Sequence, residues 1–277
     1  MSVRLIFNSV WQNPGNRGHR LNRLGRAVGW QLDKRIRHGT RTIRLPNGAL
    51  FVAHPDCVVS SALIYAAWPE FRELQFIRRL LKPGDVILDV GANVGHISLL
   101  LVDIVGAENV FAFEPTPISF QRLAENWQTN GWETSNLFQT AIGRSNGSVL
   151  IPNSTRPETK NAVSSKNGMA GGIQVPLRTL DDCREHWGRR RIGFLKIDVE
   201  GYEREVFAGA GKLLQADRPQ VIMFESLGNV VDEEIAAALG AARYRIFALD
   251  AHGNPDFSRR SNQNLFAVPE ENASSGL

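Results

Sequence analysis

The stretch VILDVGANVGH, residues 86–96, decides the fold class of this chain. Its first five residues are apolar except Asp89 and rich in β-branched side chains, which is typical of a central parallel strand covered on both faces. A turn of small residues follows, and the mostly apolar residues 97–102 continue as a helix. We expect Gly91 and Gly95 to let the backbone approach a bound molecule, because neither has a Cβ atom. The stretch therefore predicts a corner where a ligand lies on a helix N-terminus.

The order of residues at this turn separates two classes of cofactor. A dinucleotide fingerprint reads G-x-G-x-x-G, but here His96 stands where the third glycine would fall. Asp89 precedes the turn, where a carboxylate repels a phosphate but can hold, directly or through water, the ammonium and sulfonium side of S-adenosylmethionine. The alternative is a glycine turn needed only for close helix packing. The predicted cofactor-binding residues of the turn are Asp89, Gly91, Ala92, Asn93 and Gly95.

Two further segments complete the predicted cofactor site. The apolar run 110–113 ends in Glu114, and a carboxylate at the end of a second strand accepts hydrogen bonds from both ribose hydroxyls of a nucleoside. A third strand is predicted over residues 136–142, and its end offers a small apolar edge and backbone groups beside the adenine. The predicted residues of this half of the site are Glu114, Pro115, Thr140, Ala141 and Ile142.

A second strand-to-helix corner carries the predicted catalytic residues. Residues 192–198, IGFLKID, are typical of a buried strand, and residues 199–207 turn from it into a helix. Ligands bind at the carboxyl ends of parallel strands, so Asp198 and Glu200 should lie beside the first corner, as a general base or as ligands of a divalent ion. Helix capping is the alternative for both. Lys196 needs a partner if it is buried, and Asp198 faces the same side of the strand.

The composition indicates an ordinary globular protein. The chain has 277 residues, 43% of them hydrophobic, which predicts one α/β domain with a smaller appendage. Cys57 and Cys183 lie far apart without a C-x-x-C partner, so we expect free thiols in a reducing compartment and neither a zinc site nor a disulfide. No apolar run approaches the ~20 residues of a membrane span, and residues 1–12 do not read as a signal peptide. We therefore expect a cytoplasmic location.

The basic charge of the chain gathers at its N-terminus. Residues 1–45 hold ten of the 32 basic residues and one acid, Asp33, although the whole chain has a net charge of only +4. Basic and apolar residues interleave over residues 17–37, which could form an amphipathic helix on an anionic membrane or a lipid-linked substrate. We favour a solvated helix packed on the domain, because Gly25 and Gly29 interrupt the apolar spacing. Nucleic acid is disfavoured, because aromatic residues do not interleave with the basic ones.

The rest of the chain follows the pattern of alternating strands and helices. Residues 41–53 predict a β-hairpin cap outside the main sheet, around an Asn-Gly turn. A helix over 69–81 carries Glu70 and Glu73, which could approach the cofactor amine or lie on a solvated face. Residues 152–172 have no periodicity and predict a mobile loop, either a lid or simple disorder. Further predicted elements are a helix at 117–127, strands at 148–151, 173–177 and 221–225, a solvated basic loop at 184–191, a helix at 232–239 and closing antiparallel strands at 244–249 and 264–268.

These segments, in this order, resemble the FkbM family of S-adenosylmethionine-dependent methyltransferases. The matching segments are LKPGD (81–85), DVGANVG (89–95), FEP (113–115), AIG (141–143), LKIDVEG (195–201) and NLFAVP (264–269). The resemblance covers about residues 70–269 and is specific in its ordered combination. It implies a Rossmann-like methyltransferase fold, with a mostly parallel seven-stranded sheet, helices on both faces and an antiparallel closing strand. The implied domains are a basic extension over 1–68, the methyltransferase domain over 69–269 and a frayed tail over 270–277.

The resemblance also implies an activity. FkbM-type enzymes transfer a methyl group to a hydroxyl oxygen, commonly on sugars of glycans or natural products, so a small-molecule or glycan acceptor is expected. Asp198, which also borders the cofactor, would assist removal of the acceptor's proton with Glu200 or a divalent ion, and Lys196 would join them at the methyl-transfer centre. His96 stands where the family has an aromatic residue. The alternatives are an NAD-dependent oxidoreductase and a non-catalytic protein that binds a glycan or a partner on the same fold.

Overall fold

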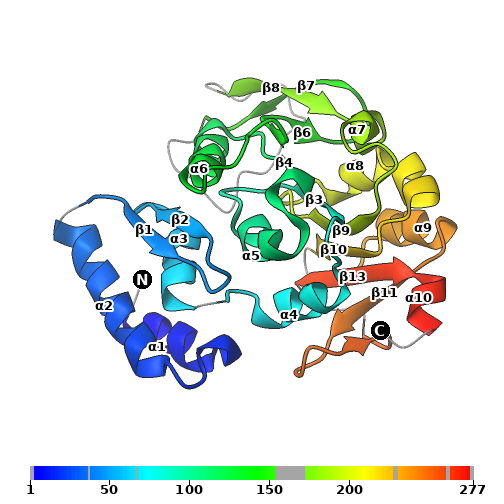
Figure 1. Cartoon of the computed structure of the whole chain (residues 1–277). Coiled ribbons are helices and arrows are strands. Elements are labelled where there is room, and N and C mark those ends of the chain that lie inside the picture. Colours follow the sequence, from blue (N-terminus) through cyan, green and yellow to red (C-terminus); the bar gives the residue numbers. More distant parts are fainter. Residues whose placement is uncertain are drawn as a thin grey trace.

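A mostly parallel sheet lies at the centre of the protein in the computed structural model (Figure 1). The structure describes residues 3–36, 38–66, 68–153, 172–226, 230–259 and 263–274. Within these ranges the strands are, in spatial order, β12 (Pro255–Asp256), β11 (Tyr244–Leu249), β13 (Asn264–Pro269), β10 (Val221–Glu225), β9 (Ile192–Ile197), β3 (Val86–Val90), β4 (Val110–Phe113) and β5 (Leu137–Phe138). As predicted, β13 runs antiparallel to β10 and β11. The short β12 adds one strand to the seven that the sequence predicts.

The helices cover both faces of this sheet. On one face lie α4 (Phe71–Leu80), α5 (His96–Val105) and α6 (Pro117–Thr129), and on the other lie α7 (Leu180–Cys183), α8 (Glu203–Ala208) and α9 (Glu233–Ala241). Strand alternation explains this division: Ile87 of β3 joins the first hydrophobic cluster, whereas Val86, Leu88 and Val90 join the second. The predicted Rossmann-like architecture is confirmed.

The chain reverses its direction of travel across the sheet at β3. From β3 it moves outward to β4 and β5, and it then returns to pair β9 with the other edge of β3, in parallel. The carboxyl ends of β3 and β9 therefore form the topological switch point, where open α/β sheets bind their ligands. Both predicted corners lie at this point.

The N-terminal segment forms a separate layer beside α4 and α5 (Figure 1). It contains α1 (Val3–Gln12), α2 (Arg20–Ile36), the predicted hairpin of β1 (Arg41–Arg44) and β2 (Leu50–Ala53), and α3 (Val58–Tyr65). The hairpin lies outside the main sheet, as predicted. α2 packs on the protein through Ala27 and Trp30, which confirms that this helix lies on the domain. No helix in the described ranges is long and apolar enough to cross a membrane.

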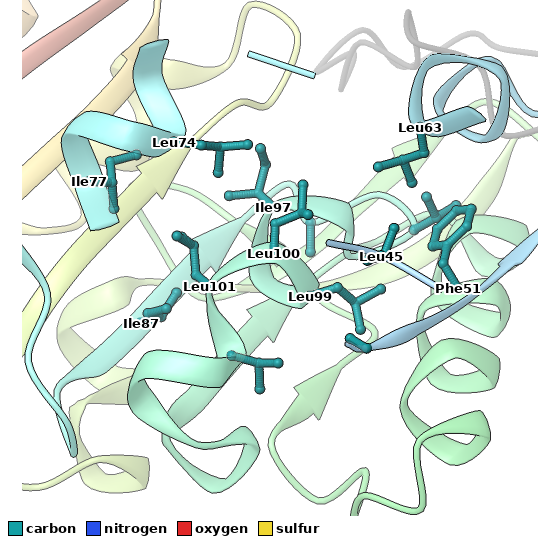
Figure 2. Packing of buried hydrophobic residues seen from close by; sticks show 14 of the residues in the cluster. Leu45, Phe51, Leu63, Leu74, Ile77, Ile87, Ile97, Leu99, Leu100 and Leu101 are labelled. Carbon is teal, nitrogen blue, oxygen red and sulfur yellow. The ribbon is translucent and has the colours of Figure 1, made fainter. Parts of the chain in front are cut away.

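The core of this layer is continuous with the core of the main domain. Figure 2 shows Leu45, Phe51 and Leu63 of the N-terminal layer beside Leu99 and Leu100 of α5, within a single hydrophobic cluster. The predicted division at residue 68 therefore does not separate two hydrophobic cores. Burial of such side chains is worth about 2 kcal/mol each, which fixes the layer to the domain.

The predicted strand over 136–142 is wrong in its extent. Its first part is β5, but the chain turns after Phe138, where the Thr140 N–H donates to the Phe138 carbonyl oxygen at 2.9 Å. The second part is β6 (Ala141–Ile142), which belongs to a separate three-stranded sheet with β8 (Ile173–Arg178) and β7 (Gly147–Ile151). A local turn thus overrides the apolar pattern, and residues 141–142 leave the main sheet.

Three other expectations differ from the structure or lie outside it. The tail does not fray at residue 270, because it forms α10 (Glu270–Ser274) against β13. The basic run at 184–191 is more than a solvated loop: Arg184 pairs with Asp217, Arg190 donates to Asn109 and Arg191 pairs with Asp85. Most of the loop predicted over 152–172 lies outside the described residues.

Candidate active site

A single cavity opens at the carboxyl ends of β3, β4 and β9, and it brings both predicted corners together. The predicted site residues that line it are Gly91, Asn93, Glu114, Pro115, Thr140, Ala141, Ile142, Lys196, Asp198 and Glu200. Asp89, Ala92 and Gly95 were predicted to bind the cofactor, but they do not line the cavity. The cavity therefore lies where the sequence predicts it, but only Gly91 and Asn93 of the five predicted turn residues line it.

The two glycines of the turn are required by packing of the protein on itself. Both have left-handed backbone φ angles, 76° at Gly91 and 80° at Gly95. A Cβ atom on Gly91 would lie 1.8 Å from the Asp198 carbonyl oxygen, and one on Gly95 would lie 2.4 Å from Leu123 of α6. The alternative of close packing therefore holds for Gly95, whereas Gly91 both packs against the second corner and lines the cavity.

Asp89 is fully buried behind the cavity wall. Its Oδ2 accepts a hydrogen bond from Ser98 Oγ at 2.7 Å, and its Oδ1 lies 3.3 Å from Lys196 Nζ. The Asp89 carboxylate therefore faces Ser98 and Lys196 and not the cavity, and its contact with a cofactor stays a prediction. The spacing of the sequence could not reveal this, because it places Asp89 on the strand without showing which side chain it meets.

Lys196 links the two corners of the site. Its Nζ donates to the Gly91 carbonyl oxygen at 2.9 Å and lies 3.3 Å from carboxylate oxygens of Asp89 and Asp198. Burial alone would lower the pKa of Lys196, but the surrounding carboxylates outweigh burial and raise it. One backbone acceptor and two carboxylates at ion-pair distance surround Nζ, so this ammonium is a fixed positive charge and not a proton acceptor. The predicted pairing of Lys196 with Asp198 is confirmed.

Glu114 is anchored at the end of β4. Its Oε2 accepts a hydrogen bond from the Asn93 N–H and its Oε1 accepts one from the Thr116 N–H, both at 2.8 Å. Burial raises the pKa of Glu114, and these two backbone donors oppose that increase. A carboxylate oxygen has more than one acceptor site, so each oxygen of Glu114 can still accept a hydrogen bond from a ribose hydroxyl. The position agrees with the predicted role.

Two buried polar atoms on the cofactor side of the cavity lack partners within the described residues. They are Asn93 Oδ1 and His96 Nδ1, and both side chains belong to the turn that begins α5. Burial and the charge of Lys196 lower the pKa of His96 to about 4, so its ring is neutral at pH 7. An unpaired buried acceptor is costly, and an ammonium or hydroxyl donor would satisfy it. The donor-rich aminoacyl and ribose groups of S-adenosylmethionine therefore fit this wall.

The opposite side of the cavity contains Glu70, which the sequence analysis allowed to approach the site, and other residues that it did not assign. Val58, Val59 and Ala62 of α3 form an apolar wall, and Glu70 and Glu225 bring two more carboxylates. Glu70 has an exposed side chain at the mouth of the cavity, and desolvation by the neighbouring protein raises the pKa of Glu70 to about 7. α3 was missed because two serines interrupt its apolar residues and no periodicity marks it.

Glu200 has a left-handed backbone with a φ of 54°, directly before Gly201. This conformation costs a non-glycine residue about 1 kcal/mol, and such strain often occurs at functional sites. The alternative role of Asp198 and Glu200 as helix caps is not observed: α8 begins at Glu203, and Tyr202 is its N-cap residue. No group of three His, Cys, Asp or Glu side chains in the described ranges is placed to hold a metal ion, so the predicted divalent ion stays a prediction.

Comparisons with known proteins agree with this geometry. A family model described as "Methyltransferase FkbM domain" matches residues 89–246, more than half of the chain. The 31-O-demethyl-FK506 methyltransferase FkbM of Streptomyces tacrolimicus is 28% identical over 248 residues, which cover 78% of this chain and 92% of the relative.

Two other relatives carry names that refer to methyl transfer. The hexuronic acid methyltransferase AglP of Haloferax volcanii is 28% identical and covers 69% of this chain and 78% of its own. The 2-O-methyltransferase NoeI of Sinorhizobium fredii is 30% identical and covers 52% of this chain and 65% of its own. With the family model over residues 89–246, these matches show that the chain belongs to the FkbM family of S-adenosylmethionine-dependent methyltransferases.

Proposed function

We propose that this methyltransferase acts on a hydroxyl group of a sugar, in a glycan or a natural product, with Asp198 as the proton acceptor. The names of the relatives support the acceptor class, because one is a 2-O-methyltransferase and another acts on a hexuronic acid. Family membership places the chain among methyltransferases and so removes the oxidoreductase alternative. The observation that carries the proposal is the placement of Asp198 in the cavity.

Asp198 has the geometry of a general base. Its side chain is 42% exposed to the cavity, and its Oδ2 lies 3.3 Å from Lys196 Nζ, so Oδ1 remains for an acceptor hydroxyl. The fixed charge of Lys196 holds the carboxylate in one orientation. Bound S-adenosylmethionine supplies a methyl group on a sulfonium, which is activated for in-line displacement. In the reaction, the acceptor oxygen would bond to the methyl carbon as that carbon's bond to sulfur breaks, with S-adenosylhomocysteine as the leaving group, while Asp198 takes the proton from the acceptor's O–H bond.

Two further hollows share residues with the cavity on the side of α3 and Glu70. One shares Glu70, Asp198, Glu225 and Gln263 with the main cavity and adds Glu73 and Asn264. These side chains are rich in hydrogen-bond acceptors, which suits a ligand with many hydroxyl donors. The other hollow shares Val58, Ala62 and Pro69 and leads to Asn8 and Gln12 of α1. The three hollows together suit an acceptor longer than one sugar ring.

The variant Asp198→Asn tests the proposed base, because it keeps the shape of the side chain and removes its basicity. We expect turnover to fall about 10²- to 10⁴-fold. The dissociation constant of S-adenosylhomocysteine should stay within about threefold, since an amide can still face Lys196. Methyl transfer to the methyl glycosides of glucuronic acid, N-acetylglucosamine and rhamnose measures the first quantity, and calorimetry measures the second.

The control variant is Glu133→Gln, which removes an exposed carboxylate outside the site and should change neither quantity. Full turnover by Asp198→Asn with normal cofactor binding would contradict the role of Asp198. Methylation of a carboxyl or amino group in place of a hydroxyl, or of none of the three glycosides, would contradict the acceptor class. Failure of the wild-type chain to bind S-adenosylhomocysteine would favour the non-catalytic alternative.

A further inference from the structure

The large apolar side chains that the protein exposes gather in its first two helices. Among the described residues, eight large hydrophobic side chains are exposed, and six of them belong to α1 and α2. The six are Phe7, Trp11, Leu21, Val28, Leu32 and Ile36. Single exposed apolar residues are common, but such a concentration on neighbouring helices marks an interaction surface.

On α2 the exposed apolar residues form one stripe. Leu21, Val28, Leu32 and Ile36 are spaced by seven and four residues, which places them on the same side of a helix. They range from 51% exposed at Leu32 to 77% at Leu21. The opposite side packs on the protein through Ala27 and Trp30. A helix that only covers a domain turns its polar side to solvent, whereas α2 turns a second apolar side outward.

The end of α1 extends this surface at the beginning of α2. The rings of Phe7 and Trp11 stack with their centroids 5.1 Å apart. The guanidinium carbon of Arg20, the first residue of α2, lies 5.1 Å from the centre of the Trp11 ring. Aromatic rings beside arginines are typical of residues that lie at the level of lipid headgroups. We call this surface, formed by the six exposed residues of α1 and α2, the N-terminal face.

The charges around the N-terminal face indicate which partner it fits. The cations beside this face are the exposed Arg17 and Arg35 together with Arg20, and the one acid of α2, Asp33, lies 3.7 Å from Arg41. A second copy of this chain would bring equal charges together, which opposes self-association through this face. A nucleic acid would leave the aliphatic stripe without a partner, because those side chains neither stack on bases nor pair with phosphates.

We propose that the N-terminal face binds the surface of an anionic lipid bilayer. The stripe and the two aromatic rings enter the region between headgroups and acyl chains, and the flanking cations attract the anionic headgroups. α2 is tied to α3 by a hydrogen bond from Trp30 Nε1 to Ser61 Oγ at 3.1 Å, and α3 forms a wall of the cavity through Val58 and Ala62. When the N-terminal face is docked, only α2 and α3 therefore separate this wall of the cavity from the bilayer. This arrangement does not depend on which acceptor the enzyme binds.

Co-sedimentation of the full chain with lipid vesicles tests this proposal. We expect binding to phosphatidylcholine vesicles that contain about one third phosphatidylglycerol, weak binding to phosphatidylcholine alone, and release as salt rises from about 0.1 M to about 0.5 M. The double variants L32N/I36N and R17E/R35E change only exposed side chains. Each should weaken vesicle binding about tenfold or more.

The matched controls are V230N and R189E, which alter an exposed valine and an exposed arginine elsewhere on the surface. Both should bind vesicles within about twofold of the wild type, and all four variants should bind S-adenosylhomocysteine normally, which shows that they are folded. Absence of vesicle binding by the wild type, or equal binding by L32N/I36N, would overturn the proposal. A dimer that L32N/I36N dissociates, or nucleic-acid binding without vesicle binding, would assign the face to another partner.

Discussion

Glu70 is the residue whose protonation most directly links the site to stability. It caps α4 with a left-handed φ of 52° and faces a hollow that also contains Glu73, Asp198 and Glu225. The positive charge of the buried Lys196 lowers the pKa of Glu70, whereas the neighbouring carboxylates raise it. Desolvation therefore dominates, and the pKa of Glu70 rises to about 7.

This raised pKa predicts a stability effect that depends on pH. The folded state binds a proton at Glu70 that the unfolded state has lost, so the cost of ionising Glu70 is absent below about pH 4.5, grows from there to about pH 7 and is complete above it. We expect Glu70→Gln to raise the melting temperature by about 2 °C at pH 8, a modest change because solvent in the cavity screens the charge. At pH 5 the difference should nearly vanish, as thermal denaturation followed by circular dichroism would show.

Glu133→Gln is the control for this prediction, since Glu133 is exposed far from the hollow. Its melting temperature should follow that of the wild type at both pH values. A destabilising effect of Glu70→Gln at pH 8 would show instead that the ionised carboxylate makes a favourable contact, with Lys196 as the nearest cation in the cavity.

Single residues also show how far sequence reasoning reaches. The pairing of Lys196 with Asp198 could be predicted, because a buried cation requires an acceptor and residues two apart face one side of a strand. The role of Asp89 could not, because its side chain points to Ser98, nine residues along the chain in α5, and not into the cavity. Spacing fixes the strand position of a carboxylate, but its partner depends on how the next helix packs.

At the scale of elements, the contact between α5 and α6 decides whether the glycine turn can form. A Cβ atom on Gly95 would lie 2.4 Å from Leu123 Cδ1 and 3.0 Å from Trp127 Cζ3, and the φ of 80° already disfavours any other residue. Gly84 has nearly the same φ, 79°, but a Cβ atom there would meet nothing within 4 Å. Substitutions at these two positions therefore distinguish the cost of backbone strain alone from the cost of strain plus steric crowding.

We expect Gly95→Ala to lower the free energy of unfolding by about 3 kcal/mol, from a strain of about 1 kcal/mol and overpacking of about 2 kcal/mol. Gly84→Ala should cost only the strain, about 1 kcal/mol. Urea denaturation of both variants measures the difference. Equal losses would mean that Leu123 moves aside without cost and that packing does not select glycine at position 95.

Elements were predicted well where periodicity or a paired motif marked them. The strands β3, β4, β9 and β10 are mostly apolar runs, as is typical of buried parallel strands, and their limits agree closely with the sequence pattern. The segment 136–142 looks similar, but the bond from Thr140 N–H to the Phe138 carbonyl turns the chain out of the sheet. α3 has no such signal, since both of its serines are buried and its helix is apolar on all sides.

At the scale of the whole molecule, the N-terminal layer depends on contacts that link distant parts of the chain. Asn16 is fully buried, and its Nδ2 donates to the Val10 carbonyl and to the Tyr65 carbonyl, both at 2.9 Å. Trp30 is fully buried against α3. Residues that lie 31 and 49 positions apart are joined by these bonds, so no local pattern could predict the layer. The strands of the main sheet, in contrast, could be predicted from local apolar patterns in the sequence.

This architecture predicts that stability and cofactor binding respond differently to damage in the N-terminal layer. The lining residues that the sequence predicts to bind the cofactor follow β3 and β4 or belong to β6, whereas α3 forms an apolar wall on the other side of the cavity. Trp30→Ala leaves a large void and removes the hydrogen bond to Ser61, so we expect a loss of about 4 kcal/mol in the free energy of unfolding. The dissociation constant of S-adenosylhomocysteine should stay within about twofold, while the KM for the acceptor rises as α3 loses its support.

Urea denaturation and calorimetry of the same preparations separate these effects. Trp30→Phe keeps most of the buried volume and loses only the bond to Ser61 Oγ, so it provides a milder variant, with an expected loss of about 1 to 2 kcal/mol. Trp11→Ala removes an exposed ring of the neighbouring helix and should cost less than about 1 kcal/mol. If S-adenosylhomocysteine binding weakened in step with stability across Trp30→Phe and Trp30→Ala, the N-terminal layer would support the cofactor side as well. Because the hydrophobic cluster of the layer also includes α5, such a result would trace the coupling to that helix and its N-terminal turn.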